Sequence, residues 1–427
     1  MKQKKIAIIG AGLSGLTLAY FLNKNHPEIS IEIFEKELEI GGKAKQKMFK
    51  NDKVAIGPKT VVLKPNSALD LLLEELNLKK DIIIPEKSAK KRWIAYKGKL
   101  LEIPSSIKGV FKSPFLSCFI SIFRDLFVKP VYKDETVKEF FSRRFSTKLT
   151  SVLIDPMFKG IYGGAIDELS IDETLGFLKT WERKYGSVLK GAFKEKRGQR
   201  QIFSFEGGLF HLAKALTENI KAKINLGIEL KKFEFSDERV TVEVGEEKKT
   251  FDHLFMATDI LGLKQLFPEF TQHFEKNYSK SITQVIFGYQ ELLPLEGFGC
   301  LIPSSEKTSV LGVLFDNQIF KIQENNKTYL TIMIEGINQS DEEYFHEATN
   351  ALNKYLNLNL EPDFTSIERY DRGIFLPKLG HKDRLESFMK DIKEKYPNVH
   401  ILGVGLKGVG VADQIQNAYD LAKEILK

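Results

Sequence analysis

The first apolar run of the chain ends in three glycines at the spacing of a phosphate-binding turn. The run 6–9 is followed by Gly10, Gly12 and Gly15, and a helical pattern begins there. In such a unit the first glycine allows a tight turn, the second lets backbone approach a pyrophosphate, and the third lets helix and strand pack closely. A second apolar run ends in an acid, Glu35, twenty residues after Gly15. The sequence therefore predicts a doubly wound, Rossmann-like α/β fold with a dinucleotide at the N-terminus of its first helix.

Two further expectations concern Glu35 and the N-terminal residues. Glu35 is placed to accept hydrogen bonds from ribose hydroxyls, and an acid there argues against a 2′-phosphate. The alternative interpretation of the N-terminus is a secretory signal peptide, because Lys2, Lys4 and Lys5 precede an apolar run. That interpretation requires a cleavage site of small residues, and residues 20–24 do not offer one.

Two more glycine-containing segments follow the acid. Gly41, Gly42 and Lys43 come within a few residues of Glu35, and the segment 57–60 contains a Gly-Pro pair. This order resembles the flavin-binding amine-oxidase-like superfamily, whose cofactor is FAD in an extended pose. The resemblance implies that the glycine pair admits the sugar-phosphate chain and that Lys43 meets its charge. The family more often has arginine there, and a lysine offers a point charge instead of a two-pronged contact.

Composition excludes several other classes of protein. The chain has 427 residues, 42% of them hydrophobic, which suits a large core in two or three domains. Its net charge of +7 comes from scattered lysines without a nucleic-acid-binding motif, so we expect no nucleic-acid partner, although anionic lipid or an anionic substrate would suit it. Cys118 and Cys300 form no disulfide framework, which fits a reducing, cytoplasmic compartment. The histidines lack metal-binding spacing, so no metal is expected. No apolar run approaches the about 18 residues of a membrane span.

The apolar pattern predicts three domains, one of them discontinuous. We expect a dinucleotide-binding domain over 1–85, 204–262 and 395–427, a helical domain over 86–203, and a mixed-sheet substrate-binding domain over 263–394.

Local patterns predict individual elements. Asp134 is expected to cap a helix whose apolar face includes Phe140 and Phe141, and Lys97-Gly98 indicates a hairpin turn. Strands are expected at 228–233, 240–244, 254–258 and 399–402, and helices at 67–76, 341–356 and from Ala412 onward.

Four further segments resemble conserved elements of one family, the oxygen-dependent protoporphyrinogen oxidases together with the coproporphyrinogen III oxidases. These segments are 155–170, 204–209, 297–312 and 403–413, and with the N-terminal glycines they cover nearly the whole chain. The chain departs from the family in two places. The segment Pro377–His381 is two residues shorter than usual, and Ala412 stands where the family has proline. Neither change removes a group that the chemistry obviously needs.

The resemblance implies a cofactor site spread along the chain. The terminal helix would point its positive end at the flavin, where its dipole favours the anionic reduced form. The residues that would bind FAD are Gly10, Ala11, Gly12, Leu13, Ser14, Gly15, Glu35, Lys36, Lys43, Gly57, Pro58, Lys59, Thr60, Ile228, Val404, Val409, Gly410 and Val411.

The resemblance also implies a substrate site. Arg92 would bind a porphyrinogen propionate, since an arginine fork suits a carboxylate; the alternative is an ordinary surface arginine. Phe298, Leu301 and Met333 would pack against the tetrapyrrole, unless they are simply core residues of strands. Gly164 would leave a carbonyl open to a pyrrole N–H.

The implied reaction is dehydrogenation of a porphyrinogen to a porphyrin, with dioxygen as acceptor, in haem biosynthesis. The expected substrate is protoporphyrinogen IX, with coproporphyrinogen III as the alternative. No catalytic side chain is expected, because the cofactor carries the chemistry. Other candidates are an amine oxidase, a carotenoid-type desaturase, or a flavin-free chaperone of prenylated Rab proteins, which shares this fold.

One segment predicts an interaction with a membrane. In residues 107–129 bulky apolar side chains interleave with Lys108, Lys112, Arg124 and Lys129, a pattern typical of interfacial segments. The alternative is a buried helix of the substrate domain. We therefore expect a cytoplasmic protein, either free or peripheral on the cytoplasmic face of a membrane.

Overall fold

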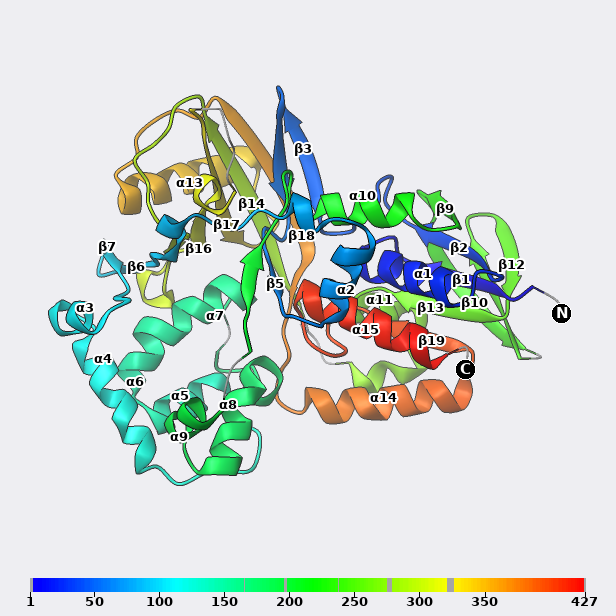
Figure 1. Cartoon of the computed structure of the whole chain (residues 1–427), viewed down its shortest axis with the longest axis horizontal. Helices are drawn as coiled ribbons and strands as arrows, with labels where there is room; N and C mark the ends of the chain where they lie inside the picture. Colours follow the sequence, from blue (N-terminus) through cyan, green and yellow to red (C-terminus); the bar gives the residue numbers. More distant parts are fainter. Residues whose placement is uncertain are drawn as a thin grey trace. The chain divides into compact units, whose positions relative to one another are not determined.

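The computed structural model describes residues 3–164, 166–195, 198–236, 238–274, 279–320 and 326–425. They form two compact units, each built from separated segments (Figure 1). The first unit comprises Met1–Ile84, Gly198–Tyr278 and Lys382–Lys427, and the second comprises Pro85–Arg197 and Ser279–His381. The helical stretch expected to form its own domain lies in the second unit together with a large sheet, and the three-domain division stays a prediction.

A five-stranded parallel sheet forms the centre of the first unit, as the glycine pattern predicts. Its strand order is β19-β13-β1-β2-β9, and helix α1 (Leu13–Asn25) connects β1 to its parallel neighbour β2. All five strands end at the same edge, where open α/β sheets bind their ligands. The strands are β1 Lys5–Ile9, β2 Ser30–Glu35, β9 Ala222–Leu226, β13 His253–Ala257 and β19 Val399–Leu402.

Smaller sheets and helices complete the first unit. Two strand pairs and a three-stranded meander adjoin the parallel sheet: β3 Lys45–Phe49 with β4 Asp52–Ile56, β5 Val61–Leu63 with β8 Gln201–Phe203, and β10 Leu230–Ser236, β11 Arg239–Val244 and β12 Glu247–Phe251. The helices are α2 Ala68–Glu75, α10 Phe210–Glu218, α11 Ile260–Leu266, α14 His381–Lys395 and α15 Val411–Glu424.

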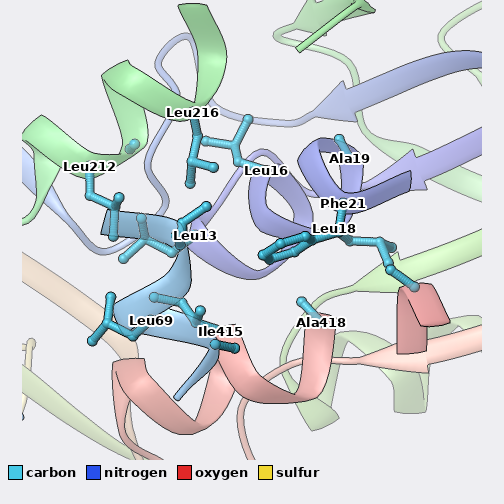
Figure 2. Packing of buried hydrophobic residues seen from close by; sticks show 14 of the residues in the cluster. Leu13, Leu16, Leu18, Ala19, Phe21, Leu69, Leu212, Leu216, Ile415 and Ala418 are labelled. Atoms are coloured by element: carbon cyan, nitrogen blue, oxygen red, sulfur yellow. The ribbon is translucent and has the colours of Figure 1, made fainter. Parts of the chain in front are cut away.

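The core of the first unit joins the two ends of the chain. Leu16 of α1 and Leu216 of α10 belong to one buried cluster, and so do Phe21 of α1 and Ala418 of α15 (Figure 2). The ring of Phe21 also meets that of Tyr419, with centroids 4.7 Å apart. Burying a large apolar side chain contributes about 1.5–3 kcal/mol, so α15 stabilises the N-terminal βαβ unit directly.

A seven-stranded mixed sheet forms the centre of the second unit, in the order β18-β14-β17-β16-β15-β6-β7. Helix α13 (Asp341–Leu356) packs on one face through residues such as Tyr344 and Leu352, and the opposite face is considered below. The strands are β6 Trp93–Tyr96, β7 Lys99–Glu102, β14 Ser279–Tyr289, β15 Gly299–Leu301, β16 Val310–Phe315, β17 Thr328–Glu335 and β18 Phe364–Phe375.

The predicted hairpin becomes an edge of this sheet. Tyr96 pairs with Lys99, and Lys97 and Gly98 both have positive φ, 53° and 73°, as a two-residue primed turn requires. β6 then pairs in parallel with β15, which lies some two hundred residues later in the chain. The turn is thus confirmed, but its place in the substrate sheet was not predicted.

Helices fill the rest of the second unit, and six charged side chains in this part, five of them buried, form one cluster. Arg144 bonds Asp125 at 2.8 Å and Glu182 at 3.1 Å, all three fully buried, and the cluster also contains Glu135, Arg143 and Lys179. Three positive and three negative charges offset one another, which a dry interior requires. The helices are α3 Ile107–Lys112, α4 Leu116–Ser121, α5 Val137–Arg144, α6 Thr147–Leu149, α7 Asp155–Tyr162, α8 Ile171–Tyr185, α9 Val188–Lys194 and α12 Asp316–Ile319.

Two local predictions need correction. Asp134 does not cap α5: Thr136 accepts a hydrogen bond from the Glu139 N–H at 3.1 Å, and Glu139 accepts one from the Thr136 N–H at 2.9 Å. This reciprocal capping box satisfies two backbone groups, where one aspartate would satisfy fewer. The strand expected at 228–233 runs over 230–236 instead. The helix at 341–356 and the strand at 399–402 are confirmed.

Candidate cofactor and substrate sites

The predicted cofactor residues of the first unit gather at the carboxyl edge of the parallel sheet. Gly10 follows β1 with φ +105°, and a Cβ on it would lie 2.6 Å from the carbonyl oxygen of Ala257, which ends β13. Gly403 follows β19 with φ +136°, and a Cβ there would lie 2.1 Å from the oxygen of Thr258. Glycine is therefore required at both turns, and the N- and C-terminal elements meet across β13.

Two glycine turns form a narrow backbone cradle at the start of α1. Gly12 caps the helix and bridges to Gly41, and the Gly41 N–H donates to the Ala11 carbonyl at 2.8 Å. A Cβ on Gly42 would approach the Gly12 Cα to 3.2 Å. The first turn of α1 carries no acid, so its free N–H groups suit an anion. The cradle fits a pyrophosphate.

Glu35 holds the glycine turn, a role that sequence analysis missed. Its buried carboxylate accepts hydrogen bonds from the Ala11 N–H at 2.7 Å and the Glu37 N–H at 3.0 Å. Its carbonyl accepts the N–H of Ile228 at 2.8 Å. Ile228 therefore lies beside Glu35 as expected, but in the loop before β10 and not in a strand. Lys36 is exposed.

The predicted residues between the glycine cradle and α2 are Lys43 and the segment 57–60. Lys43, half-buried, follows Gly42 directly. Lys59 is buried, its ammonium group donates to the Ala55 carbonyl, and its own carbonyl accepts the Ser204 hydroxyl at 2.7 Å. This last bond joins the segment 57–60 to Ser204, three residues before the Gly207-Gly208 pair that precedes α10. Flanking Lys59, Pro58 and Thr60 are half-buried, and Gly57 is buried with φ +80°.

A glycine turn precedes α15, and one hydrogen-bond acceptor next to it has no partner in the part of the chain that the structure describes. α15 begins at Val411, one residue earlier than predicted, and the Asp413 carboxylate accepts the Gly410 N–H at 3.2 Å. The Gln414 amide donates to the Gly408 carbonyl at 3.0 Å, while its buried Oε1 has no partner among the residues that the structure describes. Such an orphan acceptor fits a bound group that brings its own donor. Val404 and Val409 are half-buried on this turn.

In the second unit, two predicted substrate residues, Leu301 and Met333, share one face of the large sheet. Leu301 pairs with Gly312, Gly312 with Met333, and Met333 with Gln284. Directly paired residues point to the same face, so Leu301, Met333 and Gln284 lie in one row on the face opposite α13. Leu301 and Met333 remain half-buried there. We call this the open face.

Arg92 lies at one end of the open face and contacts Phe298. Its guanidinium carbon is 4.4 Å from the centroid of the Phe298 ring, and Nη1 donates to the carbonyls of Ala89 and Lys91. Burial lowers the pKa of Arg92, but an arginine keeps its charge in proteins. The structure thus brings two residues together that are 206 positions apart in the sequence.

The other end of the open face is crossed by α7. A Cβ on Gly160 would lie 2.5 Å from Leu301 Cδ2, so helix and strand are in close contact. The helix ends at Gly163 and Gly164, both with positive φ, and the Gly163 carbonyl accepts a hydrogen bond from Lys280 Nζ at 2.6 Å. Lys280 also pairs with Glu335 at 2.8 Å. No sequence motif indicated Lys280.

The segment 107–129, for which a membrane interaction was predicted, has buried and exposed apolar side chains. Phe115 and Cys118 are buried, whereas Phe127 is 86% exposed, and Phe193 of α9 is 89% exposed. Lys108, Lys112, Arg124 and Lys129 are exposed as well. None of the helices in the described ranges is both long and apolar enough to cross a bilayer. We define the apolar patch as the exposed residues Phe111, Ile120, Phe123, Phe127 and Phe193.

Comparison with known proteins defines the class. The profile of the flavin containing amine oxidoreductases matches residues 13–426. Protoporphyrinogen oxidase of Dictyostelium discoideum is 26% identical, and coproporphyrinogen III oxidase of Staphylococcus aureus is 25% identical, each over 99% of both chains. The crystal structure of a candidate protoporphyrinogen oxidase from Exiguobacterium sp. 255-15 superposes with a TM-score of 0.88, at 22% identity, over 100% of this chain and 99% of the other.

The fold is therefore that of a flavoprotein with a parallel nucleotide-binding sheet and a mixed second sheet. The chain belongs to the family of flavin containing amine oxidoreductases. It is a flavin-dependent oxidoreductase, and the resemblance inferred from its motifs is confirmed.

Proposed function

We propose that this chain is an FAD-dependent oxidase that converts a porphyrinogen into the corresponding porphyrin, with dioxygen as the final acceptor. The full-length relatives with porphyrinogen oxidase names support the substrate class. The cradle of Gly12 and Gly42 and the acid Glu35 support a dinucleotide form of the flavin, because both suit a pyrophosphate followed by an unphosphorylated ribose.

The observation that carries the proposal is the open face of the second unit. Arg92 provides a positive charge at its end, stacked on Phe298, and Leu301 and Met333 provide an apolar surface beside it. A macrocycle of apolar rings with carboxylates on its rim has this distribution of properties. An amine substrate would not benefit from a cation at the rim, which disfavours the amine-oxidase alternative.

In the proposed mechanism the protein binds and orients, and the cofactor supplies the redox chemistry. A bound flavin would supply the hydride acceptor for the methylene bridges and the route of the electrons to dioxygen. Arg92 holds a propionate and so fixes the macrocycle in its plane. Leu301 and Met333 keep water from its faces. The N-terminus of α15 would offer partial positive charge to the cofactor, of which Asp413 in the first turn offsets a part.

The test is an assay of the purified holoenzyme under air. Protoporphyrinogen IX and coproporphyrinogen III are supplied separately, and porphyrin fluorescence is followed with oxygen consumption. We expect porphyrin to form from at least one substrate, and flavin absorbance in the resting protein. Turnover of neither substrate would overturn the proposal. A colourless protein would favour a flavin-free binding role, and turnover of a primary amine would favour an amine oxidase.

We also propose that the apolar patch docks on an anionic membrane, which makes the protein peripheral on a cytoplasmic membrane face. Exposed aromatic side chains can enter the interfacial region of a bilayer, and neighbouring lysines attract anionic headgroups. Phe123 and Phe127 are flanked by Arg124 and Lys129, which are exposed too. The buried bond between Asp125 and Arg144 holds this segment in place beneath them.

A further inference from the structure

Lys280 is a second cation on the open face. Ile282 and Gln284 follow it at alternate positions of β14, and Gln284 lies in the row of Met333. A Cβ on Gly163 would meet Lys280 Cδ at 2.9 Å and Ile282 Cδ1 at 3.5 Å, so both side chains point to the face that α7 crosses. A Cβ on Gly164 would lie 3.6 Å from Lys280 Nζ. The ammonium group is therefore next to the turn that ends α7.

Lys280 and Arg92 lie at opposite corners of this face. β6 runs parallel to β15, and β14 runs antiparallel to both, so the start of β6 and the start of β14 are at opposite ends of the strands. Four strand spacings separate them sideways and six residues lengthwise, about 19 Å and about 20 Å. Two long side chains and a macrocycle with charged groups on opposite edges can fill that diagonal.

The ammonium group of Lys280 has capacity for another acceptor. Of its three N–H donors, one goes to the Gly163 carbonyl and one to Glu335, and no third partner occurs in the described ranges of the chain. The Lys280 side chain is 24% exposed and that of Glu335 is 42% exposed. Water screens the more exposed carboxylate more strongly, so the pair retains a net attraction for an anion that approaches along the face.

We infer that Lys280 binds a carboxylate on the porphyrinogen edge opposite to the one held by Arg92, and thereby raises the preference for coproporphyrinogen III. This inference rests on the proposed function. Protoporphyrinogen IX carries its two propionates on one edge and apolar vinyl groups on the other. Coproporphyrinogen III has propionates on both edges, so only this substrate can use both cations in one pose. Glu335 opposes the same carboxylate.

The test compares kcat/KM for the two porphyrinogens in charge variants of the holoenzyme. Lys280→Met should lower the ratio of coproporphyrinogen to protoporphyrinogen turnover about tenfold, the size of one lost hydrogen bond to a charged group. Lys280→Arg should restore the ratio. Glu335→Gln should move it in the opposite direction. Lys138→Met removes a lysine from an exposed pair with Asp167 and serves as the control for net charge.

Flavin content and thermal midpoint are measured for every variant, because Lys280 also caps α7. If the Lys280→Met variant does not fold, the effect of Glu335→Gln on the substrate ratio tests the inference alone. Equal effects of Lys280→Met on both substrates, or an unchanged ratio in Glu335→Gln, would overturn the inference while the proposed function stands. A wild-type protein that oxidises neither porphyrinogen would overturn the proposed function, and this inference with it.

Discussion

The carbonyl oxygen of Gly10 lies where a Cβ atom on Gly15 would have to be, because the two atoms would be only 2.0 Å apart. A Cβ on Gly12, by contrast, would meet nothing nearer than the Gly42 Cα at 3.8 Å, and Gly12 has φ −75°. The packing of α1 on β1 thus requires glycine at position 15. At position 12 the protein itself has room for a side chain. That side chain would, however, occupy the space that a bound pyrophosphate needs.

This difference predicts opposite behaviour of two matched variants. Gly12→Val should fold with a thermal midpoint close to that of flavin-stripped wild type but purify without flavin, because its side chain occupies the approach of the pyrophosphate. Gly15→Val should fail to fold or lose several degrees of stability. Flavin absorbance per protein and a thermal melt distinguish the two. A Gly12→Val protein that retains stoichiometric flavin would refute the cofactor assignment.

Arg92→Ala should raise KM for a porphyrinogen about tenfold or more while flavin content stays normal, since a charged hydrogen bond to a propionate is lost. Arg92→Lys should recover part of this loss, because lysine keeps the charge but not the fork. Steady-state kinetics on flavin-loaded protein provide the measurement. An unchanged KM in Arg92→Ala would mean that the guanidinium serves only its contacts with Phe298 and the carbonyls of Ala89 and Lys91.

The apolar patch predicts a loss of membrane binding in a double variant. Phe123→Ser combined with Phe127→Ser should reduce co-sedimentation with vesicles of phosphatidylglycerol and phosphatidylcholine at least tenfold, because two aromatic anchors are removed. Binding of the wild type should weaken with salt. Leu292→Ser, at a site in the same unit that is about as exposed as Phe123, is the control. Undiminished sedimentation of the double variant would argue against docking through this patch.

The buried charge cluster predicts a large loss of stability when one of its charged side chains is replaced by an uncharged one. Arg144→Met leaves the carboxylates of Asp125 and Glu182 buried with one partner fewer, which should cost about 3–5 kcal/mol. Arg143→Met should cost less, because the Arg143 side chain is 25% exposed and water can replace it. Urea unfolding of both variants measures the difference. Equal losses would contradict the burial argument.

A histidine pair predicts acid sensitivity. His253 Nδ1 and His400 Nε2 are 3.2 Å apart on neighbouring strands, and burial lowers the pKa of His400 to about 3. The unfolded chain takes up a proton near pH 6.5, whereas the folded chain does not until near pH 3, so stability should fall as the pH decreases through this interval.

Urea midpoints at pH 7.5 and pH 5 test this dependence. His400→Phe should reduce the difference between the two midpoints, because the group that resists protonation is gone and the new ring can pack on Phe255 as the imidazole does. His346→Asn, at an exposed site, should leave the difference unchanged. If His400→Phe retains the full acid-induced loss, the acid sensitivity arises elsewhere.

Local patterns predicted those parts of the fold that depend on neighbours in sequence. Gly10, Gly12 and Gly15 with Glu35 defined the βαβ unit, because each of those residues has a requirement within one turn or one strand. The Lys97-Gly98 turn was predicted for the same reason. Asp134 was misassigned as a cap, since Thr136 and Glu139 satisfy the backbone reciprocally and a single residue cannot show that.

The features that were missed depend on long-range contacts. The parallel pairing of β6 with β15 joins distant segments, and nothing in either strand specifies its neighbour. No sequence pattern distinguished Lys280 from other lysines, and only its bond to Gly163 shows that it lies beside α7. Arg144 and Glu182 are fully buried, although charged residues on a helix are usually solvated. For the candidate site, sequence motifs identified the loops that carry site residues. They did not show which of these loops lie next to one another in space.

The core of the first unit has a consequence for biogenesis. Part of the apolar surface of α1 is covered by α15, which is synthesised long after α1. Domains usually fold in order as they emerge, but this part of α1 stays uncovered until α15 has been made. Nascent chains therefore expose this apolar surface over much of their synthesis. A chain truncated before α15 would lack one wall of the core that supports the parallel sheet.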